Sequence, residues 1–247
     1  MIFDLIAGMN AGGGAAAWTP ADLFQNGEEG FWLDGSDYST MSQSRTAQVD
    51  VNAAGQPVGQ WKNKIAGQTI AFDFVSASDS ARPLTKTTSG KMSLAYDGVD
   101  DIQQTNAVVL VSGNQLSTFV GMKTGGVVSG RSVYLSANGT NNTIIIQANQ
   151  TTIAQALGQS VTSTELYSIT GSNILGLLAG VSTKPITVRV NGIEKTGSIP
   201  TTGTIGANIK VVGSAVLYAE ISQMVFINRV LTPTEIMQLE TFIGSKQ

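Results

Sequence analysis

Three carboxylates lie within five positions in the stretch Asp97-Gly98-Val99-Asp100-Asp101. Carboxylate oxygens on a turn suit Ca²⁺, so Asp97, Asp100 and Asp101 are candidate calcium ligands. Calcium takes about six to eight oxygens, and one turn supplies only part of that number. The alternative is that Asp97 and Asp100 accept backbone N–H groups of their own turn, which is common for Asp beside Gly. If two of them lie side by side, repulsion raises the pKa of at least one.

Groups for catalysis are scarce. The chain has no histidine and no cysteine, which excludes a Ser-His-Asp triad, a thiolate nucleophile and Cys-type zinc sites. A glycoside hydrolase needs two carboxylates that face each other across a cleft. Glu28 and Glu29 are adjacent and point in different directions, and residues 102–219 contain only Glu165 and Glu194 as acidic residues. We therefore expect a protein that is not an enzyme, with a glycan hydrolase as an alternative.

Two tryptophans are candidates for stacking on the apolar face of a sugar. Trp61 follows a glycine turn and lies between Gln60 and Lys62, so it is the better glycan-binding candidate of the two, although a place in the core is favoured for it as well. Trp32 lies within an apolar run and is expected in the core.

Composition limits the possible partners. The chain has 247 residues, a net charge of −3 and 42% hydrophobic residues, which is enough for a substantial core. An acidic chain lacks the basic face that nucleic-acid binding requires. No stretch is long and apolar enough to span a membrane, so we expect no membrane insertion. Apart from calcium at the acidic turn, no cofactor is expected.

The chain begins with a short apolar pattern that fits one face of a helix. A Gly/Ala tether, Gly12 to Ala17, follows it. We interpret residues 1–17 as an arm that docks on another protein and residues 18–247 as one globular domain, with a frayed terminus as the alternative to the arm. The docking residues would be Ile2, Phe3, Leu5, Ile6 and Met9.

The globular part alternates short β-branched or apolar runs with turns rich in Gly, Asn and Ser, which predicts an all-β sandwich or barrel. Expected strands are Gly30 to Asp34, Thr69 to Val75, Val108 to Val111, Leu116 to Met122, Ser132 to Leu135, Thr143 to Gln147, Ile174 to Leu178 and Tyr218 to Asn228. Thr187 to Glu194 reads as a hairpin turning at Asn191-Gly192.

A short helix is expected near the end of the chain. Thr232 is a good N-cap, Pro233 suits the first helical position and Glu235 can close a capping box. Gly244 can end this helix.

Three of these pieces, in this order, resemble a concanavalin A-like lectin/glucanase sandwich of the laminin G-like kind. Leu94 to Asp101 resembles the Phe-Asp-Gly-x-Asp-Asp turn of that family, with Tyr96 in place of Phe. Val188 to Gly192 resembles its strand carrying Asn-Gly, and Glu220 to Ile236 resembles its closing strand and helix. The resemblance implies a two-sheet antiparallel jelly-roll sandwich with a short C-terminal helix, preceded here by the N-terminal helical arm. The Glu-x-Asp-x-x-Glu string of the related glucanases does not occur.

The first part of the domain narrows the resemblance to a branch found in proteins of tailed bacteriophages and prophages. It rests on Gly27 to Met41, Gly55 to Gly59 and Ala81 to Pro83, with Gly35 where Pro is usual. The resemblance covers residues 19–245.

The resemblance to phage proteins implies a structural protein of the virion, made in the host bacterial cytoplasm and placed at the tail tip or fibre. It would contact other virion proteins through the arm, form a homo-oligomer in the particle and display a lectin-like domain to host-surface glycan. Alternatives are a head decoration protein and a soluble carbohydrate-binding module.

Overall fold

A computed structural model describes residues 17–68, 73–105, 115–124, 131–137, 142–147, 152–156, 159–162, 172–179, 186–197, 209–212 and 218–247. The helices in this part are the 3₁₀ turns η1 (Pro20–Phe24) and η2 (Tyr38–Thr40) and the α-helix α1 (Pro233–Ser245). The strands are β1 (Gly30–Asp34), β2 (Met41–Ser42), β3 (Gln60–Trp61), β4 (Phe74–Ser76), β5 (Leu84–Thr88), β6 (Lys91–Asp97), β7 (Gln103–Thr105), β8 (Leu116–Thr124), β9 (Arg131–Ala137), β10 (Asn142–Gln147), β11 (Thr152–Ala156), β12 (Gln159–Thr162), β13 (Ser172–Ala179), β14 (Ile186–Val190), β15 (Ile193–Gly197), β16 (Ile209–Val212) and β17 (Tyr218–Ile227).

The main sheet has eight strands and is antiparallel throughout. Its order is β15-β14-β13-β8-β17-β6-β5, and β1 also pairs with β17. On one edge of β17, β6 pairs with Tyr218 to Ile221 and β1 pairs with Gln223 to Ile227. The long strand β17 therefore joins the two ends of the described chain into one sheet.

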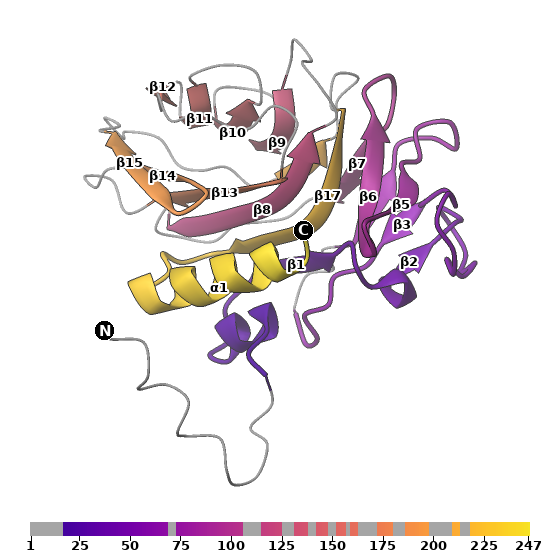
Figure 1. The fold of residues 1–247 in the computed structure, drawn as a ribbon, viewed down its shortest axis with the longest axis horizontal. Coiled ribbons are helices and arrows are strands. Elements are labelled where there is room, and N and C mark those ends of the chain that lie inside the picture. The colour runs from indigo at the N-terminus through magenta and orange to yellow at the C-terminus, as the bar shows by residue number, and fades with distance from the viewer. Residues whose placement is uncertain are drawn as a thin grey trace, which may run out of the picture.

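Smaller sheets form the second layer. One has the order β2-β3-β4-β7, another has the order β10-β9-β16, and β16 lies against β7. In Figure 1, β9 to β12 lie on one side of the main sheet and α1 lies on the other. The protein is therefore an all-β antiparallel sandwich with one α-helix on an outer face, which confirms the predicted fold class.

Aromatic side chains fill the space between the main sheet and the four-stranded sheet. The ring of Phe31 stacks on Phe226 at 5.5 Å between centroids and meets Phe74 edge-on at 5.1 Å. These three side chains are fully buried. They come from β1, β17 and β4, so this cluster fixes one layer on the other.

A second apolar cluster lies on the outer face of the main sheet, beneath α1. The helix buries Ile236, Leu239 and Ile243 there, with Phe119 and Val225 of the sheet below them. Side chains spaced by three and four residues share one face of a helix, which explains this burial.

The α1 prediction is confirmed at its start and corrected at its end. Thr232 Oγ1 accepts Glu235 N and Glu235 Oε2 accepts Thr232 N at 2.8 Å, which closes the capping box. Gly244 does not end the helix, because α1 continues to Ser245 and its C-cap, Lys246, keeps right-handed φ and ψ. A left-handed glycine is therefore not used here.

The predicted hairpin is also confirmed. β14 pairs with β15 around Asn191 and Gly192, whose φ angles are 50° and 83°. Asn and Gly tolerate these positive values, which match the twist of a two-residue hairpin.

Some predictions fall outside the described residues. These are the N-terminal arm with Ile2, Phe3, Leu5, Ile6 and Met9, and the strand expected at Val108 to Val111. Within the described part of the chain, no helix is both long and apolar enough to cross a membrane.

Candidate functional site

The acidic turn follows β6 directly, and its carboxylates bind its own backbone. Asp97 Oδ1 accepts Val99 N at 2.8 Å and Asp100 N at 3.4 Å, while Gly98 takes a φ of 76°. Asp101 Oδ2 accepts Asp97 N at 2.8 Å. The interpretation of this stretch as a self-bonded turn is therefore supported, with Asp101 rather than Asp100 as the second acceptor.

The three carboxylates lie close together, as a calcium site would require. One oxygen from each lies within 4.8 Å of the others. Asp101 is only 4% exposed, and this burial together with the charges of Asp97 and Asp100 raises its pKa to about 6. Burial and the charge of Asp101 also raise the pKa of Tyr96.

The donor set does not fit calcium by itself. Calcium needs about six to eight oxygens, and here one oxygen of Asp97 and one of Asp101 already accept backbone N–H groups. The turn is thus chiefly a connector that fixes the end of β6.

The prediction that Trp61 stacks on a glycan is wrong. Its side chain is 1% exposed, because β3 lies between β2 and β4 and turns the indole into the core. Trp32 is buried as expected, and its Nε1 donates to Gln223 Oε1 at 2.8 Å.

A groove lies instead on the outer face of the main sheet. Along β6, Leu94 and Tyr96 point inward, and Tyr96 Oη donates to Gln103 Oε1 of β7 in the other layer. Side chains alternate along a strand, so Ser93 and Ala95 point outward. Glu220 of β17 is the cross-strand neighbour of Ala95 and shares this face.

We call this region the outer groove. It consists of two hollows that both include Glu220. The acidic-end hollow has a volume of about 310 Å³ and is lined by Ser80, Arg82, Leu84, Lys86, Ala95, Tyr96, Asp97, Asp101, Ala219 and Glu220. The lysine-end hollow has a volume of about 220 Å³ and is lined by Thr88, Ser89, Lys91, Met92, Ser93, Lys123, Glu220, Ser222, Lys246 and Gln247.

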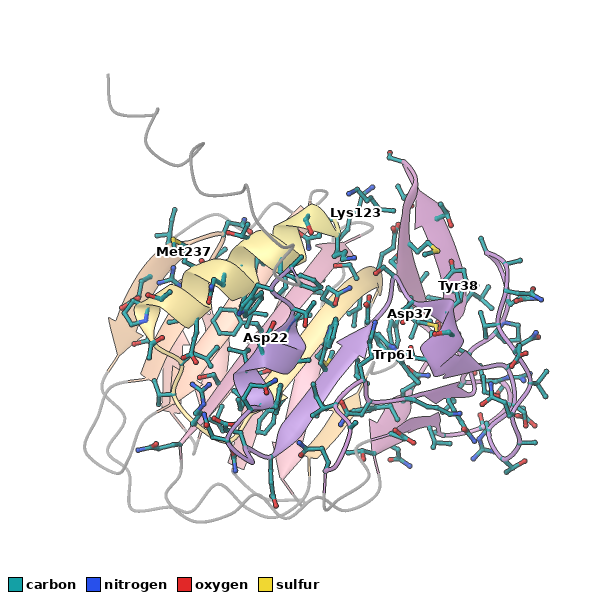
Figure 2. All side chains as sticks on the ribbon, turned by 90° about the horizontal axis from the view of Figure 1, so that it is seen from below. Asp22, Asp37, Tyr38, Trp61, Lys123 and Met237 are labelled. Carbon is teal, nitrogen blue, oxygen red and sulfur yellow. The ribbon has the colours of Figure 1, made fainter. Side chains whose placement is uncertain are left out.

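The end of α1 closes one side of the outer groove. Lys91 Nζ donates to Ser245 O at 2.6 Å, and Gln247 Nε2 donates to Met122 O at 3.3 Å. Figure 2 shows Lys123 beside this end of the helix. The helix therefore covers one part of the outer face and leaves the part over β5, β6 and β17 open.

Glu220 is held in the centre of the groove by three donors. Lys86 Nζ, Thr88 Oγ1 and Ser93 Oγ lie 2.7, 3.0 and 3.5 Å from its oxygens. Burial opposes its ionisation, but the hydrogen bonds from Lys86 and Thr88 and the charges of Lys86 and Lys123 outweigh burial and hold the pKa of Glu220 below the usual value. Glu220 is therefore a carboxylate that accepts hydrogen bonds.

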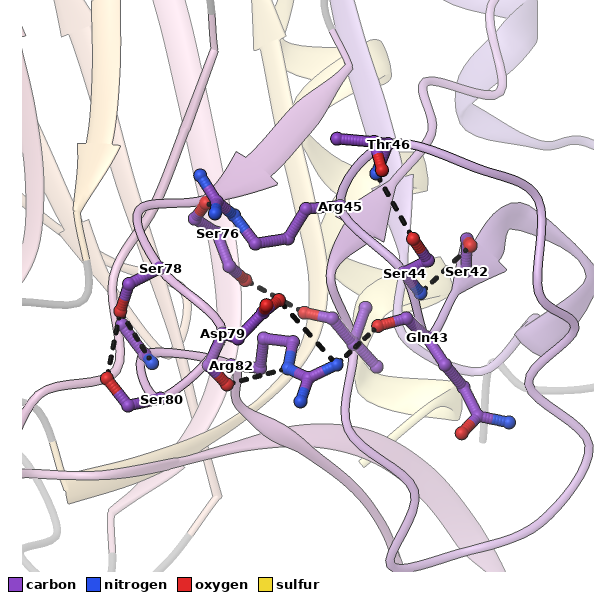
Figure 3. A network of polar contacts seen from close by, with 12 residues as sticks. Ser42, Gln43, Ser44, Arg45, Thr46, Ser76, Ser78, Asp79, Ser80 and Arg82 are labelled. Atoms are coloured by element: carbon purple, nitrogen blue, oxygen red, sulfur yellow. Dashed lines mark hydrogen bonds and ion pairs between the residues drawn. The ribbon is translucent and has the colours of Figure 1, made fainter.

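Arg82 is positioned at the other end by backbone carbonyls. Its Nε donates to Asp79 O at 2.7 Å and its Nη1 donates to Gln43 O at 3.0 Å (Figure 3). A neighbouring arginine, Arg45, binds Ser76 O at 2.7 Å and fixes the adjoining loop in the same way. The Arg82 guanidinium therefore has a defined position at the groove.

Sequence reasoning located only one end of this groove. It identified Asp97 and Asp101 but missed Glu220, Lys86 and Arg82, which lie far apart along the chain. An alternating strand with one outward acidic residue was the only available signal for Glu220. Glu28, considered there with Glu29, is bound to Arg229 Nε at 3.1 Å.

Comparisons with known proteins show which solved structures have a similar fold. No family model matches the sequence, and no curated protein matches it. Among solved structures, the chain is similar to domain 4 of AbnA, a GH43 extracellular arabinanase from Geobacillus stearothermophilus, in complex with arabinotriose. The TM-score is 0.55 at 16% identity, over 86% of this chain and 100% of that domain.

The chain is also similar to part of Trypanosoma rangeli sialidase. The TM-score is 0.51 at 15% identity, over 92% of this chain and 33% of the sialidase chain. This chain thus spans about a third of that enzyme. At such identities the likeness shows the fold, which is a lectin-like β-sandwich.

Proposed function

We propose that this protein is a carbohydrate-binding sandwich module that holds a saccharide in the outer groove. The observation that supports this most directly is the pair of hollows, each lined by charged side chains, that meet at Glu220 on the open face of the main sheet. Sugar hydroxyls both donate and accept hydrogen bonds, so ammonium, guanidinium, carboxylate and hydroxyl groups on one surface suit them. Leu84, 46% exposed, adds an apolar contact.

The fold supports this proposal. The arabinanase domain with the same sandwich is a complex with arabinotriose, and this chain covers that whole domain. A fold alone does not define a ligand, so the groove of this chain carries the argument.

We propose further that the module does not hydrolyse the saccharide. A glycosidase needs one carboxylic acid as proton donor and a second carboxylate across the bond. Glu220 is bound to Lys86 and has a lowered pKa, which suits an acceptor. Asp101 has the pKa of a proton donor, but it is 4% exposed and bound to Asp97 N.

The proposed setting is a tailed-phage virion, with the tail tip or fibre favoured over the head. The support is the sequence resemblance over residues 19–245. In this setting residues 1–17 dock the module on other virion proteins, copies of the chain assemble together, and the groove faces host-surface glycan.

A glycan array with groove variants tests the binding proposal. Ala95→Trp places a large side chain in the acidic-end hollow without entering the core. Thr87→Trp is the matched control, because Thr87 is exposed on the adjoining strand and lies outside both hollows. We expect the wild type and Thr87→Trp to bind the same saccharides and Ala95→Trp to lose them. An array without any bound saccharide, or equal binding by all three proteins, would contradict the proposal.

Two further measurements test the proposed lack of hydrolysis and the proposed position in the virion. Reducing-sugar release from a bound saccharide should stay at background, and release that disappears in Glu220→Gln would show a hydrolase. Cryo-electron microscopy of the particle should show the protein at the tail. Particle incorporation that survives deletion of residues 1–17 would show that the arm does not dock it.

A further inference from the structure

The lysine-end hollow carries more positive than negative side chains. Lys91, Lys123 and Lys246 line it, and Glu220 is the one acidic side chain in its lining. Glu220 is already paired with a fourth lysine, Lys86, at 2.7 Å from the other hollow. Its charge is therefore compensated before any of the three lysines is considered.

Two of the three lysines are also accounted for by the protein. Lys91 Nζ donates to Ser245 O in the last turn of α1, where the partial negative charge of the helix end favours a cation. Lys246 Nζ lies 5.3 Å from the centroid of the Phe242 ring, within reach of a cation–π contact. These contacts hold both ammonium groups beside the hollow.

Lys123 remains. It is the cross-strand neighbour of Glu220 on β8 and is half-buried. Its ammonium lowers the pKa of Glu220 through its charge, yet it forms no hydrogen bond or ion pair with any residue in the described ranges. The nearby carboxylate of Glu220 is already paired with Lys86, so the half-buried ammonium of Lys123 still favours an anion in the hollow that it lines.

We propose that the lysine-end hollow binds the negatively charged residue of an acidic saccharide, with Lys123 as its main partner. This inference rests on the proposed carbohydrate binding and names the class of saccharide. The ammonium of lysine acts as a point charge, so it can donate to either the carboxylate of a uronic acid or a sulfate ester. In the acidic-end hollow, Arg82 and Lys86 largely offset the charges of the three acidic side chains, so this hollow takes an uncharged neighbouring residue of the saccharide.

Calorimetric titration of the full chain with matched ligands tests this proposal. The probes are an oligogalacturonide, its methyl ester, which has the same shape without the charge, and a sulfated oligosaccharide. The acidic oligosaccharide should bind roughly tenfold more tightly than its methyl ester, as expected for one charge-assisted contact. Added salt should reduce this difference. The tighter of the two acidic probes identifies the source of the charge.

Two lysine variants test whether the preference for the acidic saccharide comes from Lys123. Lys123→Gln should abolish the preference for the acidic form, and Lys62→Gln should keep it, since Lys62 Nζ donates to Gln48 Oε1 outside both hollows. Equal thermal unfolding of Lys123→Gln and wild type shows that the fold is intact. If acid and methyl ester bind equally and Lys123→Gln changes nothing, the inference is wrong while carbohydrate binding stands. If no saccharide binds to any form, including the neutral sugars of the array, the proposed function itself fails.

Discussion

Asp101 stabilises the turn after β6 through a hydrogen bond, but it also buries a carboxyl group beside two others. Its Oδ2 accepts Asp97 N and closes the turn after β6, but the side chain is nearly buried beside two other carboxylates. Burial, reinforced by the charges of Asp97 and Asp100, raises its pKa to about 6. The folded protein therefore holds this proton more tightly than the unfolded chain, whose Asp pKa is near 3.8.

The first prediction concerns stability against pH. Between pH 4 and 6 the unfolded chain loses this proton before the folded one, so the contribution of Asp101 falls as pH rises and stays low above pH 6. Asp101→Asn keeps an oxygen for Asp97 N and removes the charge. Relative to wild type, it should gain about 2 kcal/mol between pH 4 and pH 7 in urea unfolding. Val99→Ala, an exposed change in the same turn without a titrating group, should show a difference that does not depend on pH. A pH-independent difference for Asp101→Asn would show that the carboxyl ionises normally.

The second prediction concerns calcium. Because Asp97 and Asp101 already bind backbone N–H groups, millimolar calcium should leave the melting temperature equal to that measured in EDTA. Differential scanning calorimetry measures this directly. A melting temperature that rises with calcium and loses the rise in Asp100→Asn would establish a metal site at the turn.

Arg229 joins three elements around the start of α1. Its guanidinium bonds both oxygens of Glu235 at 2.7 and 2.9 Å, Glu28 Oε1 at 3.1 Å and Leu23 O in η1 at 3.1 Å. Bidentate pairing with arginine is one of the stronger polar contacts in proteins. The end of β17, the capping box of α1 and η1 are therefore held by one side chain.

The third prediction tests this junction. Glu235→Gln weakens both the pairing with Arg229 and the cap on Thr232 N, so it should cost about 1–2 kcal/mol at pH 7. The hydrogen bond from Arg229 lowers the pKa of Glu235 to about 2, which outweighs its partial burial. This stabilisation is present above pH 4.5 and is lost as pH falls toward 2, so wild type and variant should converge in acid. Chemical unfolding over this pH range measures the gap. Thr234→Ala, exposed in the same turn, is the control, and equal stability of Glu235→Gln and wild type at pH 7 would contradict this account.

Among single helices and turns, the sequence predicted those that are set by residues close to them in the chain. The capping box at Thr232 and the Asn191-Gly192 turn lie within a few residues of the elements they set, and both were predicted. The turn η1 was missed, although Asp22 Oδ2 accepts Thr19 N at 2.7 Å in a capping pattern of the same kind. Pro20 and Asp22 after Thr19 were the available signal.

In the whole molecule, the sandwich was predictable because strand alternation and turn residues recur along the chain. The groove was not, because Lys86, Lys123 and Glu220 meet only when β5, β8 and β17 join one sheet. Trp61 was a candidate glycan contact because of its polar neighbours in sequence, and the pairing of β3 with β2 and β4 buries it. Which side chains are left uncovered depends on where α1 ends on the sheet, and no local pattern encodes that.

Saccharide binding in the outer groove is the proposal on which the others rest. Backbone amide NMR of the full chain during titration with oligogalacturonide and its methyl ester tests it most directly. We expect saturable shifts limited to β5, β6, the Asp97 to Asp101 turn, the first half of β17 and the end of β8 that carries Lys123, with the shift at Lys123 larger for the acidic form. Shifts centred on other elements, or none at saturating sugar, would contradict it.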